Sequence, residues 1–259
     1  MAPYRYPQYK MMLETEAGSY GYPHSILIHP PSISKTSEKM CQTLFRRKQN
    51  IPEDTIFRDD IFHITCARLR GKNESRIARD YTPLIVPSVE AHATLSSNRE
   101  LDIAIESVNE GWNFSNPITT PRPQPDYAVG FAYYAFSKDQ MKKLKSVTDI
   151  ENCSHFMGTW YMYFPFLTCE VKGSSVGLDI ADRQNLHNMT LMVRGVVKLF
   201  RLVNRAEELH QELVAFSVSH NNESVRIYGH YPMIEGNKTT YRTMLLRGYQ
   251  LADDGGLEK

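Results

Sequence analysis

Three residues in two short strings have the types and spacing needed for metal-dependent hydrolysis. Asp126 follows a proline at the start of the β-rich string DYAVGF, and Glu170 and Lys172 flank Val171 at the end of a second β-rich string. Side chains of a strand alternate between its two faces, so Glu170 and Lys172 share one face. We therefore expect a carboxylate beside an ammonium group, and Asp126 joins them if the two strands are neighbours.

Two carboxylates in such a place favour a hard divalent cation. Mg²⁺ and Mn²⁺ prefer oxygen ligands and commonly take one or two protein carboxylates together with waters and phosphate oxygens. Asp126 and Glu170 would be the ligands, and the metal would polarise a phosphodiester and lower the pKa of the attacking water. Lys172 would orient that water and offset developing negative charge. The structural alternative is that Glu-x-Lys in a strand is simply a solvated face.

With a following helix that carries Gln184 and Asn185, this pattern resembles the PD-(D/E)XK nuclease-like superfamily. Residues 105–231 are also similar to an uncharacterised domain family common in filamentous fungi, on the strings ESVNEGWN, RPQPDYAVGF, YMYFPFLTCEVKG, DIADRQN and SVRIYGHYP. The resemblance implies a restriction-endonuclease-like αβββαβ core in which Asp126 and Glu170 bind the metal. It places Lys172 in the position of the catalytic lysine.

The resemblance implies two further site positions. Gln184 would be the auxiliary polar residue of the helix after the lysine strand. An acidic residue of the preceding helix, Glu106 or Glu110, would complete the metal site. A helical projection at about 100° per residue turns Asn185 toward the sheet and leaves Gln184 on a flank, so Asn185 is an alternative to Gln184.

Residues 179–208 have the longest helical pattern, with an apolar arc on one side and a basic stripe on the other. The stripe consists of Arg183, His187, Arg194, Lys198, Arg201 and Arg205. It is either an ordinary solvated face or a track for the phosphate backbone of a nucleic acid.

Two smaller groups of residues are secondary candidates. Arg76 and Arg79 share a helical face at a spacing of three and could contact phosphate, although a salt bridge between Arg79 and Asp80 is the structural alternative. His220 and His230 lie near a predicted hairpin and could approach each other. Without a third ligand they do not support a metal site.

The elements that position these residues predict an α/β fold with a mixed central β-sheet flanked by helices. The expected helices cover residues 97–108, 137–145 and 179–208, and the expected strands cover 126–131, 158–172, 213–219 and 224–231. We divide the chain into an irregular Tyr/Pro-rich arm (1–35), an N-terminal helical extension packed on the core (36–95), the PD-(D/E)XK-like core (96–251) and a tail (252–259).

Composition limits the partners. The chain has 259 residues, of which 30 are Lys or Arg and 29 are Asp or Glu, for a formal net charge of +1. Any nucleic acid must therefore be held by local basic patches. No apolar run approaches the roughly 20 residues that span a bilayer, and the N-terminus lacks the apolar region of a secretory signal. We expect an intracellular protein, nuclear or cytoplasmic, with no membrane partner.

These features predict a Mg²⁺- or Mn²⁺-dependent nuclease that hydrolyses phosphodiester bonds in DNA or RNA. Two alternatives stay open at this point. The first is a nucleic-acid-binding module that has the fold without turnover, and the second is a protein-interaction or effector domain, which the Tyr/Pro-rich arm suggests.

Overall fold

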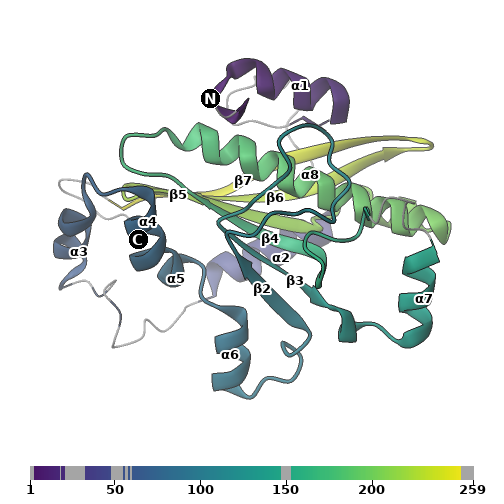
Figure 1. The fold of residues 1–259 in the computed structure, drawn as a ribbon, viewed down its shortest axis with the longest axis horizontal. Coiled ribbons are helices and arrows are strands. Elements are labelled where there is room, and N and C mark those ends of the chain that lie inside the picture. The colour runs from purple at the N-terminus through teal and green to yellow at the C-terminus, as the bar shows by residue number, and fades with distance from the viewer. Residues whose placement is uncertain are drawn as a thin grey trace.

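A seven-stranded mixed sheet with strand order β1-β7-β6-β5-β4-β3-β2 forms the centre of the protein (Figure 1). The computed structural model describes residues 3–17, 19–20, 33–47, 55, 58, 60–146 and 153–251. The strands are β1 (Ser19–Tyr20), β2 (Ala104–Val108), β3 (Tyr127–Ala132), β4 (Met162–Val171), β5 (Ala215–His220), β6 (Ser224–Glu235) and β7 (Lys238–Gln250). The α/β class and the mixed sheet predicted from the sequence are confirmed.

Helices cover the sheet on both faces. They are α1 (Pro7–Ala17), α2 (Lys35–Arg46), α3 (Phe62–Leu69), α4 (Glu74–Asp80), α5 (Thr82–Ile85), α6 (Val89–Ser96), α7 (Lys138–Ser146) and α8 (Leu178–Leu202), with 3₁₀ turns η1 (Pro3–Arg5), η2 (Tyr133–Ala135) and η3 (Ala206–Leu209). Strands β4 and β5 run parallel, and α8 makes the crossover that a parallel pair requires. Among the described residues, no helix is both long and apolar enough to cross a membrane.

The alternation of side chains along the strands builds one core on each face. Cys169 and Val171 of β4 pack in a cluster with Ile77 and other side chains from the α3–α6 segment. On the other face, Ala128 of β3 packs in a cluster with Met189 and the apolar arc of α8. Residues of β4 between the apolar ones therefore point toward α8, and Glu170 is one of them.

The helix predicted over residues 97–108 is wrong. Helix α6 ends at Ser96, Ser97 has a left-handed backbone with φ of 52°, and residues 104–108 form β2. Strand β2 pairs antiparallel with β3, with Glu106 opposite Val129. Pairing with a neighbouring strand has overridden a short helical spacing of apolar residues. The core thus has the order α6-β2-β3-β4-α8-β5, with α7 inserted between β3 and β4.

The N-terminal arm is more regular than predicted. Residues 3–17 form η1 and α1, and the side chains of Tyr4, Tyr9 and Leu13 are buried in a cluster with Leu186 of α8. Figure 1 shows α1 lying over α8 on the side away from the sheet. Residues 21–32 of the arm and the whole tail lie outside the described residues.

Other elements match the sequence more closely. Helix α7 and the β5–β6 hairpin lie where predicted, whereas the long helix ends at Leu202 instead of residue 208. Strand β7 was not predicted at all, although it pairs with β6 along most of its length.

Gly195 lies at a point where α8 and the chain before β4 come into contact. A Cβ atom at this position would collide with the carbonyl oxygen of His155 and approach the ring of Phe156. We expect Gly195→Ala to lower the free energy of unfolding by about 1–3 kcal/mol through overpacking, despite the better helix propensity of alanine. Gly248→Ala is the matched control, since nothing lies within 4 Å of the added atom. Urea denaturation of both variants measures the effect, and equal stabilities would contradict it.

His230 is a fully buried histidine between three strands. Its Nδ1 lies 2.8 Å from Thr243 Oγ1 and its Nε2 lies 2.8 Å from Ser217 Oγ. Burial lowers its pKa to about 3. The unfolded chain therefore takes up a proton below about pH 6.5 that the folded chain does not, and this contribution to stability is lost as the pH falls.

We expect acidification from about pH 7.5 to about pH 5 to reduce the free energy of unfolding of the wild type by about 2 kcal/mol more than that of His230→Gln. Urea titrations at the two pH values measure the difference. The exposed His92→Gln serves as the control. If the wild type and His230→Gln respond identically to pH, the histidine is not held neutral in the fold.

Candidate active site

Asp126, Glu170 and Lys172 converge at the edge of the sheet where β4 ends. Strands β3 and β4 are antiparallel neighbours with Tyr127 opposite Cys169, so the residue before β3 lies beside the end of β4. The Val171 backbone N–H donates to Asp126 Oδ2 at 2.7 Å. Lys172 Nζ lies 3.9 Å from Asp126 Oδ2 and 3.9 Å from Glu170 Oε2. The structure thus brings together the three groups that the sequence singled out.

Glu170 is the most deeply buried member of this group, with 1% of its surface exposed. Its Oε1 accepts a hydrogen bond of 2.8 Å from Asn188 Nδ2, and its Oε2 faces Lys172. Burial and, after it, the nearby charge of Asp126 raise the pKa of Glu170 well above its usual value. Burial also raises the pKa of Asp126, although Lys172 and the Val171 N–H both act to lower that pKa.

A third carboxylate, Glu74, completes the ring around the lysine. Glu74 Oε1 lies 3.9 Å from Lys172 Nζ, and burial raises the pKa of Glu74. It is the first residue of α4, whose N-terminus is capped by Asn73. A Cβ at Gly173 would lie 3.3 Å from the Glu74 backbone nitrogen, so glycine permits α4 to approach the lysine strand this closely.

Glu74 was missed in the sequence, as was Asn188. Glu74 lies in the polar string KNESRIARD, in which Arg76 and Arg79 were the predicted candidates. Asn188 lies one helical turn after Gln184, so the spacing of α8 offered a signal for it.

The two auxiliary candidates on α8 differ in their surroundings. Asn185 Oδ1 accepts from Thr168 Oγ1 at 2.7 Å, and its Nδ2 donates to the Val218 carbonyl oxygen at 2.9 Å. Asn185 therefore ties α8 to β4 and β5 and has no polar group left for a ligand. Gln184 is partly exposed, its Oε1 is buried without a hydrogen-bond partner among the described residues, and it lies one turn before Asn188. Gln184 is accordingly the freer of the two.

Glu106 and Glu110 do not lie on a helix and make other contacts. Glu106, on β2, accepts from Ser88 Oγ at 2.9 Å and from Tyr127 OH at 2.7 Å, and it also binds the Val89 N–H at the start of α6. Glu110 accepts a short hydrogen bond from Tyr161 OH. The predicted role of either residue as a third metal ligand is corrected, because both carboxylates are engaged in holding other elements.

The donor set suits a cation that keeps much of its water. Three carboxylates surround a single ammonium group, and burial is the main cause that raises the pKa of Asp126 and of Glu170. In the part of the chain that the structure describes, no group of three or more His, Cys, Asp or Glu side chains is arranged to hold a metal ion. Asp126 and Glu170 could hold Mg²⁺ or Mn²⁺ as a pair, with water and substrate oxygens completing the shell.

The basic stripe predicted on α8 is not a free surface. Arg183 Nε donates to the Tyr4 carbonyl oxygen at 2.6 Å, and His187 is fully buried with its Nδ1 3.0 Å from Tyr4 OH. The N-terminal segment therefore covers the first half of the stripe, which the sequence could not show because the segment was predicted to be irregular. Farther along, Arg201 donates to Thr239 Oγ1 at 2.8 Å, and Arg205 pairs with Glu208 at 2.7 Å. Arg194 and Lys198 are half-buried.

The secondary candidates also change. Asp80 pairs with Arg79 at 2.7 Å, as the structural alternative predicted, and with Arg76 at 2.5 Å. His220 pairs with Val225 in the β5–β6 register, whereas His230 pairs with Ala215 at the other end of the hairpin. The expected proximity of the two histidines is therefore wrong.

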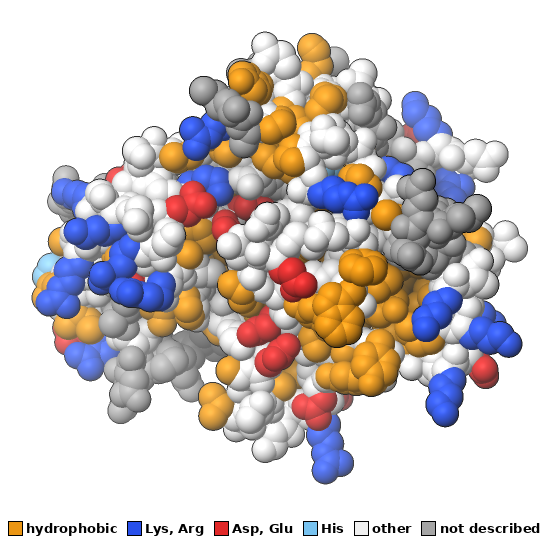
Figure 2. Space-filling model, in the orientation of Figure 1, with side chains coloured by type: hydrophobic (Ala, Val, Ile, Leu, Met, Phe, Trp, Pro, Cys, Tyr) orange, Lys and Arg blue, Asp and Glu red, His pale blue; other side chains and the backbone are white. Residues whose placement is uncertain are grey.

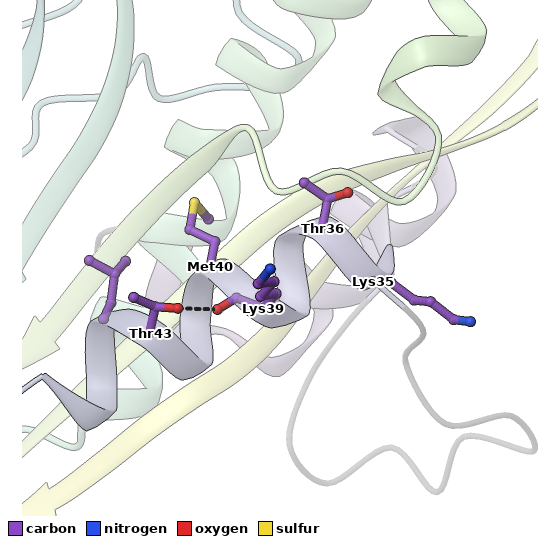
Figure 3. Close-up of a pocket in the computed structure, with 6 residues that line it drawn as sticks. Lys35, Thr36, Lys39, Met40 and Thr43 are labelled. Carbon is purple, nitrogen blue, oxygen red and sulfur yellow. Dashed lines mark hydrogen bonds between the residues drawn. The ribbon is translucent and has the colours of Figure 1, made fainter.

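Two surface hollows lie away from this site. One runs along α2 and is lined by Lys35, Thr36, Lys39, Met40, Thr43 and Leu44. Figure 3 shows its side chains on a single helix, with Thr43 Oγ1 donating to the Lys39 carbonyl oxygen at 2.8 Å. The other lies between α7 and α8, with Leu144 and Leu199 in its lining. Neither contains a residue of the acidic and lysine group.

Residues 61–259 match a domain family of unknown function, DUF7924. The chain belongs to this family. The matched region contains Glu74, Asp126, Glu170, Lys172 and Asn188, whereas η1, α1 and α2 precede it. No curated protein matches the sequence.

Glu170→Gln tests the electrostatics of the site in this DUF7924 protein. Glutamine can still accept from Asn188 but removes a buried negative charge, so we expect the free energy of unfolding at about pH 7.5 without metal to rise by about 1–2 kcal/mol. The folded wild type takes up a proton on Glu170 more readily than the unfolded chain, so its disadvantage shrinks as the pH falls toward about 4. Denaturant unfolding at several pH values measures this, with the exposed Glu100→Gln as control. A loss of stability at pH 7.5 would show that the Lys172 contact outweighs the cost of burial.

Proposed function

We propose that this protein is a divalent-metal-dependent hydrolase of phosphodiester bonds in nucleic acid, working inside the cell. The observation that carries the proposal is the convergence of Asp126 and Glu170 around Lys172, from residues 44 positions apart, at a buried edge of the sheet. Such a combination of perturbed carboxylates and one amine is a feature of catalytic sites. The family description assigns no function, so the proposal depends on the geometry.

In this proposal, Asp126 and Glu170 hold Mg²⁺ or Mn²⁺, which supplies Lewis-acid activation of the scissile phosphate and of the attacking water. The chain fixes both carboxylates in advance, because Asn188 holds Glu170 Oε1 and the Val171 N–H holds Asp126 Oδ2. Little reorganisation is then needed when a substrate binds.

Lys172 has two parts in the proposed reaction. Its ammonium group orients the attacking water and offsets the negative charge that develops on the phosphoryl oxygens as the new O–P bond forms and the bond to the leaving oxygen breaks. Lys172 is 6% exposed, and the hydrogen bond that its Nζ donates to the Val171 carbonyl oxygen limits the motion of the side chain. Gln184, whose Oε1 has no hydrogen-bond partner among the described residues, is the proposed auxiliary residue that contacts water or phosphate.

The test is cleavage of DNA and RNA by the full chain with Mg²⁺ or Mn²⁺. We expect EDTA to abolish cutting and Asp126→Asn, Glu170→Gln and Lys172→Met each to lower kcat/KM by about 100-fold or more. Gln184→Ala should have a smaller effect, because that residue only supports the site. Glu100→Gln, an exposed change of the same chemical kind, should cut normally. Variants as active as the wild type would reject these assignments.

A nucleic-acid-binding module without turnover is the second candidate. It is favoured because no three acidic, His or Cys side chains among the described residues are arranged to hold a metal ion, and because Glu106 and Glu110 are engaged elsewhere. Binding of DNA or RNA without cleavage in either metal would support this module and contradict the hydrolase.

A further inference from the structure

A group of exposed basic side chains lies on α3, α4 and the turn that joins them. We call it the α3–α4 patch, and it consists of Arg68, Arg70, Lys72, Arg76 and Arg79. Figure 2 shows Lys and Arg side chains gathered at the left edge of the molecule, over the place that α3 and α4 occupy in Figure 1. Acidic side chains lie toward the middle of the same face.

The segment that carries this patch has an excess of positive charge. Residues 61–80 contain five basic and two acidic residues, whereas the whole chain has a net charge of only +1. Asp80 is shared by Arg76 and Arg79. Arg68, Arg70 and Lys72 have no carboxylate partner in the part of the chain that the structure describes. Three exposed cations are therefore available to an anionic ligand.

The patch directly adjoins the candidate active site. The carbonyl oxygen of Lys72 accepts from Ser174 Oγ at 3.3 Å, two residues after Lys172. Glu74, two residues after Lys72, faces Lys172 Nζ. Asn73 and Gly173 lie in contact, since a Cβ on the glycine would meet the Asn73 carbonyl carbon at 3.8 Å. One end of the patch is thus attached to the turn that carries the lysine.

We infer that the α3–α4 patch binds the sugar–phosphate backbone of a nucleic acid and leads it to the site formed by Asp126, Glu170 and Lys172. The inference rests on the proposed function and deepens it, because it assigns the substrate-binding surface to α3 and α4 in place of the covered stripe on α8. A row of separate cations beside a site for one phosphodiester fits a repeating polyanion better than a single phosphate. The contact is with backbone phosphates, so it carries no base preference.

Binding in EDTA separates this inference from the proposed function, because no cleavage is needed to observe it. The probes are a short fluorescent DNA duplex and a single-stranded RNA of equal length, each titrated over a range of salt concentrations. We expect Arg68→Ala/Arg70→Ala/Lys72→Ala to weaken binding of the preferred probe by about tenfold or more. The slope of log K against log salt for the duplex should fall by about 2–3, since each lost phosphate contact removes about 0.9.

The matched control removes three exposed lysines from another part of the molecule, as Lys142→Ala/Lys143→Ala/Lys145→Ala on α7. Figure 1 places α7 on the side opposite α3. Unchanged binding by this control, together with weakened binding by the patch variant, supports the inference. Equal losses in both variants, no loss in the patch variant, or no binding by the wild type would each overturn it. Binding that depends on the patch without any cutting would instead overturn the hydrolase and leave the patch as a binding surface.

Discussion

Burial of the Glu170 carboxylate is the constraint on which the arrangement of the core depends. Removing a carboxylate from water is costly unless other groups compensate its charge and fill its hydrogen-bonding capacity. Here one oxygen receives the Asn188 amide and the other faces Lys172. Helix α8 must therefore lie on β4 with the Asn188 side chain facing Glu170, and the Lys172 side chain must point back toward Glu170. The proposed metal site depends on this burial of a carboxylate with like charges beside it.

The packing around this group shows how the sheet and α8 are locked together. Thr168 and Glu170 are on the same face of β4, and each contacts an asparagine of α8, namely Asn185 and Asn188. The alternating residues Cys169 and Val171 are buried in the apolar cluster on the opposite face, against the α3–α6 segment. The strand is thus polar toward α8 near its end and apolar toward the smaller helices. Both sets of contacts hold the end of β4 and the residue after it in place.

The segment before the DUF7924 region changes the surface of α8. Tyr4 and Tyr9 pack edge to face with ring centroids 4.6 Å apart, and both hydroxyls approach His187. Arg183 and His187 thereby become parts of an interior, although their spacing on the helix is that of a solvated basic stripe. The charge of Arg5 also acts on Glu74, where it opposes the upward pKa shift of that carboxylate. The N-terminal segment therefore reaches both the helix and the rim of the site.

Local pattern determined much of this protein. The β-rich strings around Asp126 and Glu170, the hairpin of β5 and β6, and helix α7 follow from periodicity and turn residues, and the alternation within β4 alone places Glu170 and Lys172 on one face. Tertiary contacts decided the rest. Residues 104–108 became a strand because β3 offered a partner, and Glu106 accepts hydrogen bonds from Ser88 and Tyr127. The first half of the stripe on α8 was covered by the N-terminal segment from the far end of the chain. Glu74 reached Lys172 from a segment nearly 100 residues away. The position of a residue in its helix or strand determines toward which face its side chain points. Which residues that side chain then contacts depends on which other helix or strand packs against that face, and this is decided by the packing of the whole chain.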